Sequence, residues 1–143
     1  MPQRVALVSC VKSKLAAPTA AKDLYTSALF RGMRAYAEIV ADAWYILSAE
    51  HGLLDPERTT APYERTLNRM PAAERAAWAG TVKKRLEGVL PIGADVVMLA
   101  GERYREHLIP FLKARGHRVE IPLEGLPLGR QLRELNRLTR SND

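Results

Sequence analysis

The chain has 143 residues, with 22 lysines and arginines against 16 aspartates and glutamates, giving a formal net charge of +6 at pH 7. This length predicts one domain spanning residues 1–143, and the hydrophobic and charged fractions, 47% and 27%, are typical of soluble globular proteins. No apolar run is long enough to cross a membrane. The single cysteine, Cys10, excludes an internal disulfide. We expect a cytoplasmic protein without a signal peptide.

The predicted elements alternate between strands and helices along the chain. Short apolar runs predict buried strands at 5–8, 44–47 and 95–100, and a shorter edge strand at 118–121. Apolar residues at helical spacing predict helices over 18–42, 71–90, 102–115 and 128–139. The segment 55–70 holds Pro56 and Pro62 and reads as an irregular connection. This order predicts an α/β fold, in which a four-stranded, mostly parallel sheet has helices on both faces.

In such a sheet, right-handed crossovers bring the loops after all four strands to one edge, where ligands of α/β proteins bind. The first of these loops carries Lys12 and Lys14, which could face a phosphate or could simply be solvated. Tyr25 and Tyr63 are aromatic residues that could line a pocket at this edge, although a buried tyrosine is more often a core residue. The predicted substrate-binding residues are Ser9, Cys10, Lys12, Lys14, Tyr25, Ser48, Gly52, Tyr63, Gly101 and Tyr104.

The stretch 44–55, Trp-Tyr-Ile-Leu-Ser-Ala-Glu-His-Gly-Leu-Leu-Asp, passes from a buried strand to polar residues. Its candidate catalytic side chains are Glu50, His51 and Asp55. A carboxylate could stabilise positive charge on a sugar or orient water, and an imidazole could stabilise a leaving base. The alternatives are a solvated turn and a Cys10 nucleophile with His51 as its base. No metal or other cofactor is expected, because His51, His107 and His117 lack ligand spacing.

Four arginines recur at helical spacing near the end of the chain: Arg130, Arg133, Arg137 and Arg140. Together with the net positive charge, this stripe predicts contact with a nucleic-acid backbone. An ordinary solvated helix face, partly offset by Glu134, explains the same spacing.

The segments 8–14, 23–30 and 44–53 resemble a bacterial and phage domain family of unknown function. That family is similar to a short form of the YaaA-type peroxide-stress proteins and, more distantly, to the uracil-DNA glycosylase superfamily. The resemblance implies a three-layer α/β/α sandwich and a base-directed or nucleic-acid-directed site at 48–55. The chain lacks the glycosylases' Gly-Gln-Asp-Pro-type and His-Pro-Ser loops. In the family the residue at the position of Glu50 varies, so the resemblance favours His51 and Asp55 over Glu50 as catalytic residues.

These observations lead to a functional hypothesis: a metal-independent, DNA glycosylase-like enzyme that acts on a modified or damaged base in DNA repair or phage defence. Nucleic acid is the expected partner, DNA more than RNA, and the expected state is a monomer or weak homodimer. Three alternatives remain open. They are a non-catalytic module that binds DNA or tRNA, an enzyme acting on a free nucleotide or nucleoside, and a partner subunit of a tRNA-modifying enzyme.

Overall fold

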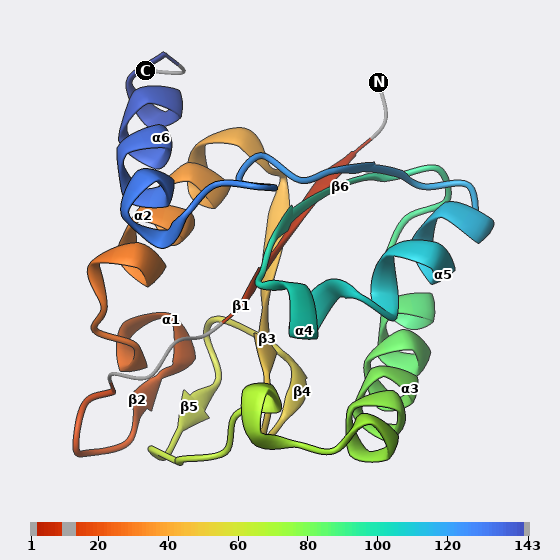
Figure 1. The fold of residues 1–143 in the computed structure, drawn as a ribbon, viewed down its shortest axis with the longest axis horizontal. Helices are drawn as coiled ribbons and strands as arrows, with labels where there is room; N and C mark the ends of the chain where they lie inside the picture. Colours follow the sequence, from red (N-terminus) through yellow and green to blue (C-terminus); the bar gives the residue numbers. More distant parts are fainter. Residues whose placement is uncertain (1–2, 10–13, 142–143) are drawn as a thin grey trace.

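The computed structural model describes residues 3–9 and 14–141, and its centre is a five-stranded sheet (Figure 1). The strands are β1 (Arg4–Ser9), β3 (Ala43–Ser48), β4 (Gly52–Leu54), β6 (Asp95–Leu99) and β7 (Arg118–Glu120). Their order is β4-β3-β1-β6-β7, with all neighbours parallel except β3 and β4. The predicted α/β class is confirmed, and the predicted count of four strands is wrong because β4 pairs antiparallel with the end of β3.

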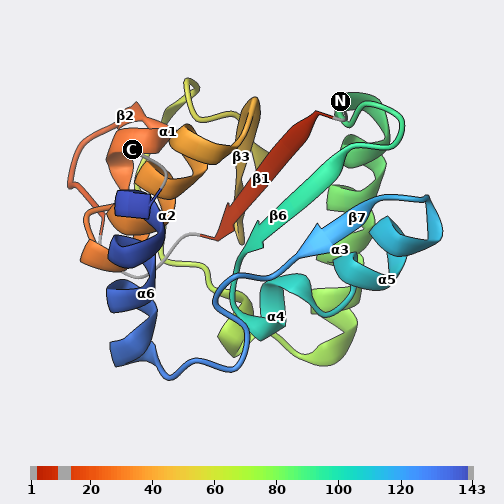
Figure 2. The same cartoon turned by 90° about the horizontal axis from the view of Figure 1, so that it is seen from above.

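Helices cover both faces of this sheet (Figure 2). One face carries α1 (Ala21–Leu24), α2 (Ala28–Val40) and α6 (Leu128–Ser141), and the other carries α3 (Ala72–Val89), α4 (Glu102–Arg105) and α5 (Leu108–Ala114). Successive β1 residues point to opposite faces, so Val5 and Leu7 join one core cluster while Ala6 and Val8 join the other. Burial on both faces explains why the β1 sequence is continuously apolar.

The prediction of a single helix over 18–42 is wrong. Thr19–Ala20 forms β2, which pairs antiparallel with β5 (Thr59–Thr60), and the chain is extended at Tyr25 between α1 and α2. The Ser27 hydroxyl accepts the Phe30 amide hydrogen bond at 3.1 Å and so begins α2 as its N-cap. The predicted helix over 102–115 is likewise divided, into α4 and α5. The other predicted helices and strands are confirmed within three residues at each end.

The turn between β3 and β4 is a tight hairpin of three residues, Ala49 to His51. Gly52 follows it with a φ of 71°, a left-handed conformation that glycine adopts without strain. The Ser48 hydroxyl accepts the His51 amide hydrogen bond at 3.0 Å across this turn. This hairpin therefore sets the direction in which the polar residues after β3 point.

The long connection from β4 to α3 contains β5 and a short 3-10 helix, η1 (Leu67–Arg69). It therefore has more regular structure than the irregular segment predicted for 55–70. Within the part of the chain that the structure describes, no helix combines the length and apolarity needed to cross a bilayer.

Candidate functional site

The tip of the β3–β4 hairpin forms one wall of an open hollow of about 380 Å³. Glu50 is exposed there, and His51 is half-buried. We call this the hairpin hollow; its lining residues are Ala49, Glu50, His51, Gly52, Arg65, Met70, Glu74, Ala77, Trp78 and Thr81. Two predicted catalytic side chains, an imidazole and a carboxylate, thus share one opening at the carboxyl end of a parallel strand.

The opposite wall of the hairpin hollow comes from α3, and the sequence prediction missed it. Glu74, Trp78 and Thr81 stand on one face of this helix, three and four residues apart. The Trp78 indole donates a 2.8 Å hydrogen bond from Nε1 to the Ser48 carbonyl oxygen, which holds the ring against the hairpin. The signal in the sequence was this mixture of aromatic and polar side chains on one helix face.

Arg65 adds a cation to the hairpin hollow from the connection before η1, and its side chain is exposed. The hollow therefore presents two carboxylates, an imidazole and a guanidinium around a fixed aromatic ring. A flat ring at van der Waals distance can stack on the indole, and the charged groups can bind or polarise a sugar or phosphate attached to it.

Beside the hairpin hollow lies a group of four side chains that we call the tyrosine cluster: Lys14, Tyr25, Ser48 and Tyr63. Ser48 is fully buried and donates from Oγ to the Tyr63 hydroxyl oxygen at 2.7 Å. The Tyr63 and Tyr25 hydroxyl oxygens are 2.6 Å apart. The Nζ of Lys14 lies 4.5 Å from the centre of the Tyr63 ring and 5.7 Å from that of Tyr25.

The tyrosine cluster touches the hairpin hollow through His51. The imidazole meets the Tyr63 ring edge-on, with ring centres 5.5 Å apart. The structure therefore brings together five predicted site residues from four separate segments of the chain: Lys14, Tyr25, Ser48, His51 and Tyr63.

Asp55 is not part of this assembly, in contrast to the prediction that it lies on the rim with His51. Because β4 runs antiparallel to β3, Leu54 pairs with Ile46 and the chain moves away from the carboxyl edge. At about 3.3 Å per residue, Asp55 stands roughly 10 Å along the strand from Gly52. Its carboxylate instead accepts the Glu57 amide hydrogen bond at 2.8 Å and holds the following turn.

Three other residues predicted to lie on the rim, Tyr104, Gly101 and Ser9, lie outside the hairpin hollow. Tyr104 is buried, its hydroxyl accepts the Leu67 amide hydrogen bond at 3.5 Å, and its ring meets Trp78 edge-on with centres 5.7 Å apart. Gly101 is exposed as the N-cap of α4, and Ser9 is buried at the end of β1. Cys10 and Lys12 lie outside the described residues.

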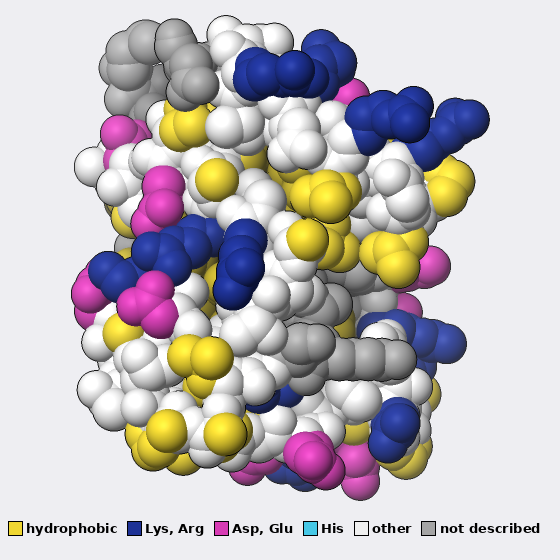
Figure 3. Space-filling view, turned by 90° about the vertical axis from the view of Figure 1, so that its left-hand side faces the viewer, with side chains coloured by type: hydrophobic (Ala, Val, Ile, Leu, Met, Phe, Trp, Pro, Cys, Tyr) yellow, Lys and Arg dark blue, Asp and Glu magenta, His cyan; other side chains and the backbone are white. Residues whose placement is uncertain are grey.

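The arginine stripe lies on α6, which packs against α2, whereas the hairpin hollow is lined by α3 on the other face of the sheet. All four arginines are exposed, and Arg137 is bound by Glu134 through two hydrogen bonds of 2.7 and 2.8 Å. On the side that bears α2 and α6, lysine and arginine side chains gather in separate groups with acidic side chains between them (Figure 3). The structure does not bring the stripe together with His51.

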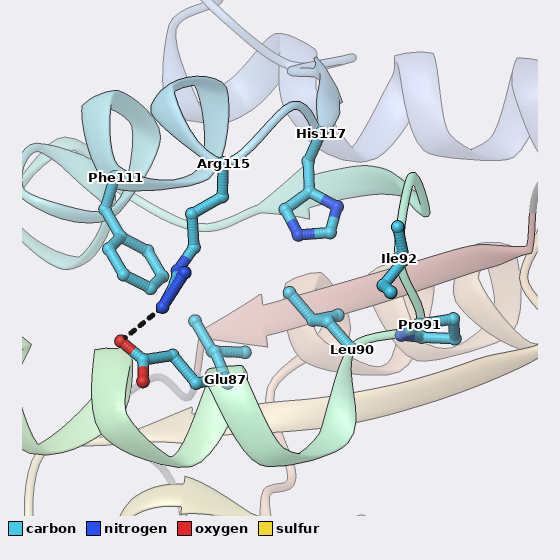
Figure 4. A pocket seen from close by; sticks show the side chains of 8 residues that line it. Glu87, Leu90, Pro91, Ile92, Phe111, Arg115 and His117 are labelled. Atoms are coloured by element: carbon cyan, nitrogen blue, oxygen red, sulfur yellow. Dashed lines mark ion pairs between the residues drawn. The ribbon is translucent and has the colours of Figure 1, made fainter.

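A second, smaller hollow of about 150 Å³ lies between the end of α3 and α5 (Figure 4). Its charged groups are already paired: Arg115 binds Glu87 at 2.8 Å, and His117 donates from Nδ1 to the Ala94 carbonyl oxygen at 2.9 Å. Its other walls are apolar, from residues such as Leu90 and Phe111. Because its polar groups are satisfied, it is a poorer candidate for chemistry than the hairpin hollow.

Across residues 3–9 and 14–141, no three His, Cys, Asp or Glu side chains are grouped so that they could hold a metal ion. The chain is 29% identical to the "Uncharacterized protein YfjM" of Bacillus subtilis (strain 168), over 94% of each chain. The model of a "Family of unknown function (DUF6884)" matches residues 5–137, which include the hairpin, Tyr63 and Lys14. The chain therefore belongs to the DUF6884 family, whose function is unknown.

Proposed function

We propose that this protein is a DNA glycosylase-like enzyme that hydrolyses the N-glycosidic bond between a sugar and a modified or damaged base. The observation that carries the proposal is the hairpin hollow, where Glu50 and His51 face a space that also holds the fixed indole of Trp78. The resemblance of residues 8–14, 23–30 and 44–53 to a family distantly similar to uracil-DNA glycosylases supports the same reaction class.

In the proposed reaction, the base stacks on Trp78 and the bond between the base nitrogen and the sugar C1′ breaks. The bonding electron pair leaves with the base, and a protonated His51 donates a proton to it. Positive charge develops on the sugar and is stabilised by the Glu50 carboxylate, which then accepts a proton from the water that adds to C1′. Glu50 replaces Asp55 as the working carboxylate, because Asp55 stands at the far end of β4.

The test is to incubate the protein with single-stranded and duplex DNA carrying assorted modified bases, and with free nucleosides and nucleotides, and to measure released base. Glu50→Gln and His51→Gln should each slow release by about 10²- to 10⁴-fold, the usual contribution of a general acid or base. Glu87→Gln, an exposed carboxylate on the far side of α3, is the matched control and should keep the wild-type rate. If Asp55→Asn abolishes release and Glu50→Gln does not, the carboxylate is wrongly assigned.

A second candidate function is nucleic-acid binding without catalysis, favoured by the exposed Arg130, Arg133 and Arg140 and by the net charge of +6. It predicts binding to DNA or tRNA that weakens with salt. A plot of the logarithm of the association constant against the logarithm of the salt concentration has a negative slope. Reversing the charge of one arginine should make that slope shallower by about 1 for each phosphate that the arginine neutralises in the wild type. Binding without release of any base, and without an effect of His51→Gln, would favour this function over the enzyme.

A further inference from the structure

The backbone of Lys14 is held in place by pairing with the segment around Tyr25. Residue 14 forms an antiparallel bridge with Tyr25, and the Leu15 amide donates a 2.8 Å hydrogen bond to the Leu24 carbonyl oxygen. Tyr25 itself is buried, with 2% of its surface exposed. The lysine side chain therefore begins from a rigid position and runs across two tyrosine rings that belong to the folded core.

The charge of Lys14 has no acidic partner within the described part of the chain. In that part of the chain, no carboxylate oxygen lies within 4.0 Å of Lys14 Nζ, the limit for an ion pair. By contrast, Lys22 Nζ is bound to Glu57 at 2.6 Å. Lys14 is half-buried as a residue, and its ammonium is instead stabilised by the faces of Tyr63 and Tyr25. A partly desolvated cation that is stabilised by aromatic rings gains further free energy when an anion binds it.

The ammonium does not line the hairpin hollow, but it is linked to His51 of that hollow through the Tyr63 ring. Lys14 Nζ and the His51 ring centre both lie within 5.5 Å of the Tyr63 ring centre. Lys14 Nζ therefore lies no more than 10.0 Å (4.5 plus 5.5 Å) from the His51 ring centre, a span that a nucleotide bound beside His51 can bridge with its phosphate. Both positions lie after the carboxyl ends of parallel strands, β1 and β3, where α/β proteins bind phosphorylated ligands.

We propose that Lys14, held over Tyr25 and Tyr63, is a binding subsite for a phosphate group, so that the ligand of the hairpin hollow is a nucleotide unit and not an unphosphorylated nucleoside. The identity of the ligand as a nucleotide rests on the proposed function, whereas phosphate binding at Lys14 does not. The phosphate can come from a free nucleoside monophosphate or from the backbone of a nucleic acid, which share this chemistry.

The first arm of the test measures phosphate binding alone. Inorganic phosphate is titrated into the full-length protein, and its dissociation constant is measured by calorimetry. Lys14→Gln should weaken binding by about 10- to 100-fold, the loss expected for one charge-assisted hydrogen bond, and Lys14→Arg should restore most of it. Lys113→Gln makes the same change in net charge at an exposed site on α5 and should leave the dissociation constant unchanged.

The second arm separates the two sources of phosphate and the two proposals. Binding of a deoxynucleoside monophosphate is compared with binding of a dinucleotide that lacks a terminal phosphate. Tighter binding of the monophosphate indicates that the ligand is a free nucleotide. Tighter binding of the dinucleotide indicates that the phosphate belongs to a nucleic-acid backbone. Phosphate binding that depends on Lys14, with no base released from any substrate, would keep the subsite and reject the glycosidase. Base release that is equal from nucleosides and nucleotides, and insensitive to Lys14→Gln, would reject the subsite and keep the glycosidase.

An unchanged dissociation constant for phosphate in Lys14→Gln overturns the subsite directly. A change in fold is checked by near-ultraviolet circular dichroism, because Tyr25 and Tyr63 report on the packing of the cluster. If Lys14→Gln alters that spectrum, the Lys14→Arg variant, which keeps the cation over the rings, decides the question: normal phosphate binding supports the subsite, and loss of it despite a native spectrum contradicts it.

Discussion

Tyr63 makes several of the contacts that hold the candidate site together, a role that no motif in the sequence indicated. Its hydroxyl lies 2.7 Å from Ser48 and 2.6 Å from Tyr25, its face carries Lys14, and its ring stands nearly perpendicular to that of His51. The side chain thus joins the loop after β1 to the tip of the β3–β4 hairpin. We regard Tyr63 as a positioning residue for both parts of the site.

At this scale we predict that Tyr63→Phe separates the hydroxyl's role from that of the ring. It removes the acceptor of the hydrogen bond that the buried Ser48 hydroxyl donates, so the free energy of unfolding should fall by about 1–3 kcal/mol in chemical denaturation. The ring contact with Lys14 remains, so phosphate binding should weaken much less than in Lys14→Gln. Tyr45→Phe, on the same strand as Ser48, is the control and should change neither quantity. Equal effects of the two tyrosine variants would contradict the prediction.

Among the elements, the β3–β4 hairpin decides where the site residues go. It directs Glu50 and His51 into the hollow and takes Asp55 away from it. Helix α3 holds the hairpin from one face: Trp78 donates to the Ser48 carbonyl oxygen, and Arg85 donates to the Leu53 carbonyl oxygen at 2.7 Å. The position of the hollow is therefore a property of this pair of elements.

The hairpin depends on the left-handed backbone of Gly52, with its φ of 71°. A Cβ there would lie 3.6 Å from Val82 Cγ2, an ordinary contact, so the cost of Gly52→Ala comes from the backbone and should be about 1–2 kcal/mol. Gly80→Ala, in the middle of α3 where a Cβ would meet nothing within 4 Å, should instead stabilise the protein by about 0.5–1 kcal/mol. Thermal or urea unfolding measures both, and a stabilised Gly52→Ala variant would contradict this account of the turn.

On the scale of the whole molecule, Tyr36 of α2 lies among charged groups from three other elements: Arg4 of β1, Glu120 of β7 and Glu134 of α6. Burial of the phenol raises the pKa of Tyr36 above its ordinary value of 10.0, and the Arg4 charge opposes that rise. The folded protein therefore favours the neutral form of the Tyr36 phenol more than the unfolded chain does.

A raised pKa in the folded state means that this contribution to stability is complete below the unfolded pKa and is lost as the pH rises through the folded pKa. Lys22 acts in the same direction, since its hydrogen bond to Glu57 raises the pKa of Lys22 above 10.5. We therefore predict that the free energy of unfolding falls above about pH 10. Tyr36→Phe should make that fall shallower, whereas Tyr45→Phe, on the other face of the sheet, should not. Denaturant unfolding at a series of alkaline pH values measures this, and parallel pH profiles for wild type and Tyr36→Phe would contradict it.

The sequence by itself determined the α/β class, the four parallel strands, and the positions of α3 and α6. Apolar periodicity and strand length are local signals, and parallel pairing follows from their order along the chain. Ser48, His51 and Lys14 were predicted to share one edge because they follow recognisable strands, whereas Tyr25 and Tyr63 were chosen only as aromatic residues that could reach that edge.

Only the tertiary structure decided that Gly52–Leu54 pairs as β4, and this pairing moved Asp55 out of the site and left Glu50 beside His51. A three-residue strand has too few residues to show a period, so its pairing depends on the neighbour it meets. The recruitment of Trp78 has the same origin. Its position on α3 marks it as a core residue in sequence, and it becomes a wall of the hairpin hollow because α3 packs against the hairpin tip.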